Sequence, residues 1–191
     1  MKFYQTKLPE VIIFEPIVFS DARGEFMESF REDVLNEAIG MNIKFCQENQ
    51  SLSSKGVIRG LHYQSGPFAQ SKLVSVVSGK VLDVVVDIRR HSPTFGEHIS
   101  IELSESNKKR LFIPRGFAHG FKALENHTIL SYKVDNYYSI QHDRGIIYND
   151  YQLNIDWEVK NDDEILVSQK DLGLPSFKNI NHFNYEENLY E

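Results

Sequence analysis

Short strand-like runs recur along this 191-residue chain and constrain its fold more than any other feature. Most are rich in β-branched and aromatic residues and are separated by Gly, Pro, Ser or Asn. They lie at residues 11–14, 26–30, 57–59, 73–77, 81–88, 98–103, 111–113, 120–124 and 128–133. Because strands and helices do not alternate, we predict an all-β jelly roll, that is, an antiparallel double sheet with one or two short peripheral helices.

One helix is predicted at residues 32–39. Val34, Leu35, Ala38 and Ile39 fall on one face of this segment, and Gly40 suits a C-cap. A weaker helix is expected near the C-terminus. No linker or repeat divides the chain, so we expect a single domain over residues 1–191, with an acidic and aromatic tail from about residue 181 that packs on a partner subunit.

Composition excludes several classes of function. A formal net charge of -6 repels nucleic acid, and no apolar run is long enough for a membrane span. The N-terminus lacks the features of a secretory signal, so a cytoplasmic location is expected. The single cysteine, Cys46, has no partner for a disulfide or a metal site and is expected to be a buried, reduced filler.

The segment from Arg59 to Lys72 combines one proton-transfer group with two cations. His62 lies between these cations, inside a run that reads as strand. Arg59 and His62 are three residues apart and would point to opposite faces of an ideal strand, but Gly60 permits a bulge that re-aims one of them. A proton-transfer site and a structural core histidine are both compatible with this segment alone.

A second cluster surrounds His119. Pro114 and Gly116 predict a turn between strands, which places His119 at a strand mouth, where small barrels bind ligands. A structural turn with a partly buried histidine is the alternative. The Pro-x-Gly-x-x-His spacing resembles the second motif of the cupin superfamily, many members of which hold a metal. The first cupin motif would require a second histidine near His62, and none is present, so we predict no metal.

A longer series of motifs resembles the dTDP-4-dehydrorhamnose 3,5-epimerase family. The segments that carry the resemblance occur in the family's order at residues 19–30, 47–53, 56–64, 86–96, 113–121, 132–138 and 145–150. The resemblance implies a metal-independent, cofactor-free homodimer of cupin type. It also implies epimerisation of a nucleotide-linked 4-keto-6-deoxyhexose at carbons 3 and 5.

Four residues match the catalytic positions of that family. The resemblance implies that His62 is the base and Asp171 the carboxylate that pairs with it. It implies that Lys72 is the cation beside the enolate oxygen and that Tyr132 is the acid on the opposite face. A C–H bond beside a ketone is a poor acid, so its cleavage needs such a set. Without the resemblance, a packed aromatic and a solvated loop charge would be preferred for Tyr132 and Asp171.

Substrate contacts are implied by the same resemblance. Arg23 and Arg59 suit the diphosphate because a planar fork makes bidentate contacts, and Tyr138 suits stacking on the base. The sequence departs from the family pattern at Asp143, where Glu is expected, and at Tyr148, where Trp is common. The implied binding residues are Arg23, Glu28, Gln47, Glu48, Asn49, Arg59, His119, Tyr138, Asp143 and Lys170.

The predicted function is therefore epimerisation of dTDP-4-keto-6-deoxy-D-glucose to dTDP-4-keto-L-rhamnose. One alternative is an epimerase that acts on a single carbon, or on another nucleotide-linked 4-keto sugar such as a GDP-heptose. A second is a non-catalytic cupin that binds a sugar nucleotide, and a third is a metal-dependent cupin oxygenase or isomerase.

Overall fold

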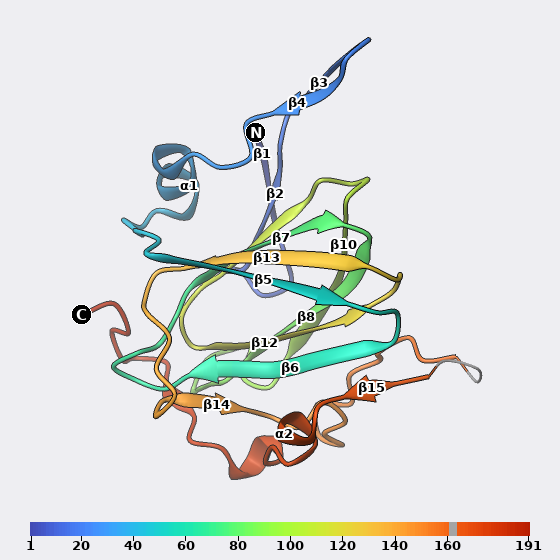
Figure 1. Ribbon diagram of the computed structural model, residues 1–191. Coiled ribbons are helices and arrows are strands. Elements are labelled where there is room, and N and C mark those ends of the chain that lie inside the picture. The colour runs from blue at the N-terminus through green and yellow to red at the C-terminus, as the bar shows by residue number, and fades with distance from the viewer. Residues whose placement is uncertain (161–163) are drawn as a thin grey trace.

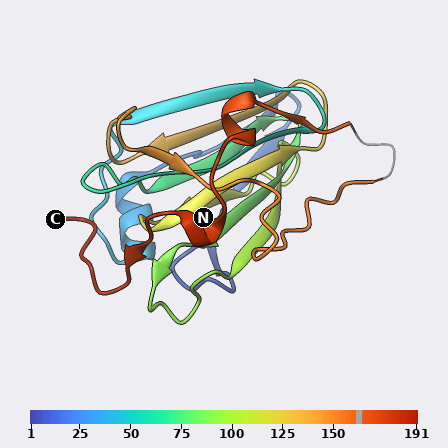
Figure 2. The same cartoon turned by 90° about the horizontal axis from the view of Figure 1, so that it is seen from below.

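The computed structural model describes residues 1–160 and 164–191 and consists mainly of two facing antiparallel sheets (Figures 1 and 2). The first sheet has the order β1-β2-β11-β7-β13-β5, and the second has the order β10-β8-β12-β6-β14. The jelly-roll prediction is confirmed. The first sheet comprises β1 (Lys2–Gln5), β2 (Ile12–Glu15), β5 (Gln47–Ser53), β7 (Lys72–Ser78), β11 (Arg110–Ile113) and β13 (Thr128–Val134).

The second sheet is extended on one side by a parallel strand and covered by C-terminal segments. β15 (Leu166–Val167) pairs with β6 and leads into α2 (Gln169–Leu172) and the 3₁₀ turn η1 (Phe177–Asn179). The five strands on its main path are β6 (Val57–Gln64), β8 (Lys80–Asp87), β10 (His98–Ser104), β12 (Phe117–Ala123) and β14 (Asp143–Gly145).

Apolar side chains fill three layers. Between the sheets lie residues such as Val74, Val85 and Leu130, while Leu61 and Trp157 pack on the outer face of the second sheet. The outer face of the first sheet is covered by α1 (Glu32–Ile39), whose Leu35 is buried. The helix has the predicted bounds, and Gly40 adopts the left-handed C-cap conformation. Among the described residues, the helices are all too short or too polar to cross a membrane.

The β3–β4 hairpin projects away from both sheets (Figure 1). Its strands are β3 (Val18–Asp21) and β4 (Gly24–Met27). The predicted strand at residues 26–30 is therefore only partly correct, because β4 ends at Met27. Phe19 and Phe26 are 63% and 72% exposed, so the hairpin presents an apolar surface to solvent.

One prediction about packing is wrong. Cys46 is exposed, because it lies where the chain enters an edge strand, and its Sγ donates a hydrogen bond to the carbonyl of Val134 at 3.7 Å. The acidic tail docks on its own chain, where β16 (Phe183–Asn184) pairs in parallel with β9 (Arg89–Arg90). The phenol of Tyr190 lies 2.8 Å from Ser71 Oγ. Aromatic anchors therefore hold the tail against the subunit that carries it.

Gly60 allows two strands of the second sheet to approach closely. His62 pairs with His119, and Arg59 pairs with Phe121, so β6 advances three residues where β12 advances two. The predicted bulge is therefore confirmed. Gly60 has a φ of 116°, and a Cβ there would lie 2.6 Å from Gly120 Cα. Because Arg59 and His62 then face the interior together, this bulge positions the site.

Gly60→Ala is expected to lower the free energy of unfolding by roughly 2–4 kcal/mol, because it adds a backbone clash to an unfavourable φ. Gly24→Ala is the matched control, since Gly24 has a φ of 122° and no atom within 4 Å of a built Cβ. Its loss should be smaller, about 1–2 kcal/mol. Urea unfolding of both variants measures the difference, and equal losses would contradict the role assigned to the close approach.

Candidate active site

A pocket of about 720 Å³ opens between the sheets, a size suited to a small-molecule ligand. A smaller pocket of about 200 Å³ adjoins it and shares His62, Lys72, Tyr132 and Lys170. The larger pocket brings together predicted residues from both sheets and from α2, namely Asn49, Arg59, His62, Lys72, His119, Tyr132, Lys170 and Asp171.

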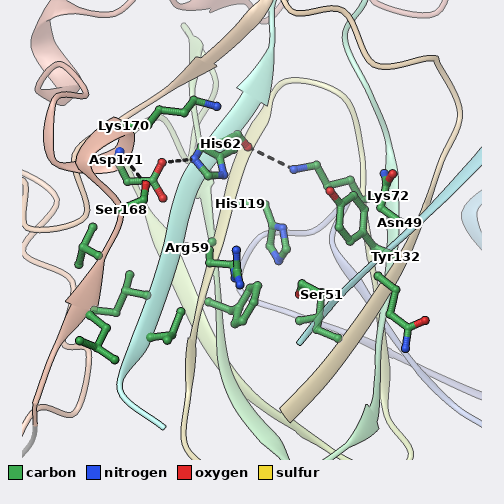
Figure 3. Close-up of a pocket in the computed structure, with 18 of the residues that line it drawn as sticks. Asn49, Ser51, Arg59, His62, Lys72, His119, Tyr132, Ser168, Lys170 and Asp171 are labelled. Atoms are coloured by element: carbon green, nitrogen blue, oxygen red, sulfur yellow. Dashed lines mark hydrogen bonds and ion pairs between the residues drawn. The ribbon is translucent and has the colours of Figure 1, made fainter. Parts of the chain in front are cut away.

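His62 and Asp171 form a hydrogen-bonded pair on one wall (Figure 3), with Nε2 of the imidazole 2.7 Å from Oδ1 of the carboxylate. The residues are 109 positions apart in the chain. The short helix α2 brings Asp171 to the wall, and the Ser168 hydroxyl caps that helix by accepting from the Asp171 N–H at 3.1 Å. The carboxylate therefore occupies Nε2 and leaves Nδ1 of the imidazole able to accept a proton.

The charge of Asp171 is stabilised by its partners. Burial alone would raise the pKa of this carboxyl, but the hydrogen bond with His62, the charge of His62 and the Gly60 N–H outweigh burial and lower the pKa. Asp171 is only 3% exposed. An ionised carboxylate at this position favours the imidazolium that His62 becomes when it accepts a proton.

Lys72 and Tyr132 lie across the pocket from the His62–Asp171 pair (Figure 3). Lys72 Nζ donates to the carbonyl of His62 at 3.2 Å and lies 5.9 Å from the centre of the Tyr132 ring. Burial raises the pKa of Tyr132, partly offset by a hydrogen bond with Asn49. The phenol therefore keeps its proton throughout the neutral range.

Lys72 is expected to set an alkaline limit to activity. Burial lowers the pKa of its ammonium group from the ordinary 10.5 to about 8, although Asp83 and Asp143 oppose the change. If the cation is needed, kcat/KM should fall as the pH rises through about 8, where Lys72 loses its proton. Tyr132 remains protonated in that range because its pKa is raised. A pH–rate profile that stays level up to pH 10 would contradict this role for Lys72.

His119 is buried rather than placed at a strand mouth, which corrects the prediction. It is the third residue of β12, stands in register with His62 on β6 and is 6% exposed. Its Nε2 lies 2.9 Å from Oδ2 of Asp83, and burial lowers the pKa of His119 in spite of that carboxylate. The residue still lines the pocket, as the sequence predicted.

Arg59 is anchored at the entrance of the larger pocket. Its Nε donates to Ser53 Oγ at 3.1 Å, and one terminal nitrogen donates to the carbonyl of Leu52 at 3.2 Å. The remaining guanidinium N–H groups are available to an anion.

The rim of the smaller pocket is a polar network around Asp143. Its Oδ2 accepts from the Tyr138 phenol at 3.1 Å and forms an ion pair with Lys170. Gln47 Oε1 accepts from the Tyr138 backbone N–H at 3.1 Å, and Gln47 Nε2 donates to Asn49 Oδ1 at 2.8 Å. This network holds an exposed tyrosine ring beside the pocket.

Four predicted binding residues do not line these pockets: Gln47, which contacts the lining residues Asn49 and Tyr138, and the three residues Arg23, Glu28 and Glu48. Arg23 is on the projecting hairpin, where it pairs with Asp21, and Glu28 follows that hairpin. Glu48 pairs with Lys133 at 2.7 Å and alternates with the pocket-facing Asn49 along β5. The chain by itself does not bring these three side chains to the site.

Sequence reasoning missed Asp83, Ser51 and the apolar wall formed by β15. Asp83 had a detectable signal, because it is an acidic residue within the valine-rich run 81–88. Ser51 lies in the pocket with a buried Oγ that lacks a hydrogen-bond partner among the described residues.

The donor set does not form a metal site. Within residues 1–160 and 164–191, no group of three or more His, Cys, Asp or Glu side chains is placed to hold a metal ion. The histidines of the pocket are instead each engaged by a carboxylate, Asp171 or Asp83. Fold and site together define a cupin-type jelly roll with an acid–base pocket.

Comparison with known proteins narrows this class of protein to one family. The family model described as dTDP-4-dehydrorhamnose 3,5-epimerase matches residues 5–179. The dTDP-4-dehydrorhamnose 3,5-epimerase of Shigella flexneri is 49% identical over 183 residues, which cover 96% of this chain and 99% of that protein. The chain therefore belongs to the dTDP-4-dehydrorhamnose 3,5-epimerase family, whose members are isomerases.

Two solved structures show the range of the similarity. The dTDP-6-deoxy-D-glucose-3,5-epimerase of Legionella pneumophila, in complex with dTDP-4-keto-L-rhamnose, is 41% identical with a TM-score of 0.93, and the match covers 97% of this chain and 99% of that one. A 3'-monoepimerase from Streptomyces bikiniensis, in complex with dTDP-quinovose, is 29% identical with a TM-score of 0.85. This match covers 92% of this chain and 87% of that one.

Proposed function

We propose that this protein epimerises dTDP-4-keto-6-deoxy-D-glucose at carbons 3 and 5 to give dTDP-4-keto-L-rhamnose. The observation that carries the proposal is the single pocket that holds the His62–Asp171 pair on one side and Lys72 with Tyr132 on the other. Inversion beside a ketone needs a base on one face, an acid on the other and a positive charge near the oxygen.

The proposed reaction begins at a carbon next to the 4-ketone. His62 removes its proton, and the electrons of the C–H bond form a carbon–carbon double bond while the ketone oxygen becomes an enolate stabilised by Lys72. Tyr132 then returns a proton to the opposite face of that carbon, and the ketone reforms. His62 loses its proton to solvent, Tyr132 regains one from solvent, and the same steps invert the second carbon.

The nucleotide would be held at the two ends of the pocket. Arg59 offers guanidinium N–H groups to the diphosphate, and the exposed ring of Tyr138 offers a stacking surface for the base. The network of Gln47, Asn49, Asp143 and Lys170 would orient the nucleoside beside that ring.

We infer a homodimer, because apolar surface and an unpaired strand edge lie together near the N-terminus. β1 is the edge of the first sheet and its residues are exposed, as are Phe19 and Phe26 on the hairpin. Arg23 and Glu28 would then serve the site of the second copy, since they project away from their own. Gel filtration should give twice the chain mass of 22.2 kDa, and a monomer would contradict this.

A second candidate is inversion of one carbon only. It is favoured by the similarity to the monoepimerase, while the departures at Asp143 and Tyr148 bear on which substrate binds. Proton NMR of products from a panel of nucleotide-linked 4-keto sugars distinguishes the candidates. The proposal expects the dTDP sugar to be inverted at both carbons without added metal or cofactor. Preference for a GDP sugar, or inversion of a single carbon, would overturn it.

We further propose that residues 1–191 act as one catalytic domain in the cytoplasm, because the N-terminal segment lacks the features of a secretory signal. A non-catalytic sugar-nucleotide-binding role would leave the nucleotide bound and the sugar unchanged in the same NMR assay.

A further inference from the structure

A second histidine–carboxylate pair lies beneath the pocket, on the central strands of the second sheet. Asp83 on β8 is fully buried, and His119 on β12 contacts it through Nε2 at 2.9 Å. Asp83 stands in register with Phe121, two residues along β12 from His119. The two side chains are therefore diagonal neighbours on the interior face.

Asp83 places a carboxyl group in apolar surroundings. Its same-face neighbours on β8 are Val81 and Val85, and both belong to the apolar layer between the sheets. Its Oδ1 has no hydrogen-bond partner among the described residues. A buried carboxylate is strongly unfavourable unless a cation compensates it, so a nearby positive charge is required.

His119 does not supply this charge. Burial lowers the pKa of His119, and the attraction of Asp83 does not reverse that effect, so the ring is neutral at pH 7. With Oδ2 of Asp83 accepting at Nε2, the proton of the neutral ring resides there, and Nδ1 is left as an acceptor.

Lys72 is a buried cation in the same interior between the sheets, whereas Arg59, which also lines the pocket, is exposed. Lys72 lies on the same face of β7 as Val74 and Val76 of the apolar layer and is only 7% exposed. Its register partner on β11 is the apolar Ile113. Titratable groups surround Lys72 from five other strands, namely His62 on β6, Asp83 on β8, His119 on β12, Tyr132 on β13 and Asp143 on β14.

Two of these groups are anions that act on Lys72. Asp83 has the stronger effect, and Asp143 is already engaged by Lys170.

We propose that Asp83 is the buried counter-charge that keeps Lys72 protonated, and that the same carboxylate fixes His119 as its neutral Nε2–H tautomer. Asp83 does not line the pocket. It is thus a positioning residue that acts through Lys72 and His119. The consequence for catalysis rests on the proposed role of Lys72 at the enolate oxygen, whereas the charge pairing itself does not.

NMR titration of the lysine side chains tests the pairing without substrate. In protein labelled with ¹³C-lysine, with the Lys72 signal assigned from Lys72→Met, Asp83→Asn should lower the pKa of Lys72 by about one unit or more. Asp87→Asn is the matched control, because Asp87 is equally buried on β8 but is paired with Arg89. An unchanged Lys72 titration in Asp83→Asn, or an equal shift in Asp87→Asn, would overturn the proposal.

The pH dependence of turnover then tests the link to the reaction. In Asp83→Asn, the alkaline fall of kcat/KM should move to lower pH by the shift seen in the titration. A shifted titration with an unmoved pH–rate profile would leave the pairing intact and contradict the role of Lys72 in the proposed function. The two failures are therefore distinguishable.

A double-mutant cycle covers the case in which Asp83→Asn folds poorly. Each single change leaves one buried charge without its partner, whereas Lys72→Met with Asp83→Asn removes both. The proposal expects the double variant to retain more stability than the sum of the two single losses allows. Additive losses, or a double variant less stable than that sum, would overturn it.

Discussion

His62→Asn should lower kcat by a factor on the order of 10²–10⁴, because a positioned base contributes an effect of that size. Asn is polar but smaller than His and cannot accept the substrate proton. The nucleotide contacts are untouched, so KM should change far less than kcat. Steady-state kinetics with dTDP-4-keto-6-deoxy-D-glucose, and binding of dTDP by calorimetry, measure the two effects separately.

His91→Asn is the matched control for this variant. His91 is exposed, lies outside both pockets and has a φ of 71°, a conformation that Asn tolerates well. Its activity should equal that of the unaltered protein. Retention of more than about a tenth of kcat by His62→Asn would show that another group removes the proton.

Tyr132→Phe should separate proton removal from inversion. The ring keeps its packing and its position near Lys72, but the phenol proton that would be delivered to the opposite face is lost. Epimerised product should fall by roughly 10²-fold or more. Exchange of substrate protons with solvent deuterium should fall less, because His62 can still remove and return a proton on its own face.

Tyr151→Phe, at a residue that is 77% exposed, provides the control for this change. It should leave both product formation and exchange unaltered. If Tyr132→Phe formed inverted product at the normal rate, the acid would have to be another group or solvent, and the two-faced mechanism would be wrong.

The fold was largely predictable because its apolar strands carry a clear pattern. The valine-rich run at 81–88 became β8, and the helix at 32–39 has the predicted ends. The strand β5 was not predicted as a strand, because Asn49 and Ser51 place polar side chains toward the pocket. A strand that lines a polar site lacks the hydrophobic alternation from which strands are recognised.

Tertiary contacts limited the prediction of the site. Sequence pattern alone left His62 and Asp171 without a reason to be paired, because their contact depends on where the short helix α2 docks. The burial of His119 likewise depends on its contact with Asp83 across two strands, which a local turn signal cannot reveal. The family resemblance supplied the pairing of His62 with Asp171, and the structure shows how the two side chains are held together.

Solvent deuterium incorporation reports directly on proton exchange at the carbons beside the ketone. The protein, without added metal or cofactor, is incubated with dTDP-4-keto-6-deoxy-D-glucose in D₂O, and the product is examined by proton NMR and mass spectrometry. The proposed epimerisation should place deuterium at both carbon 3 and carbon 5, with the L-rhamno configuration in the product. Absence of exchange at both carbons with a correctly folded protein would contradict it.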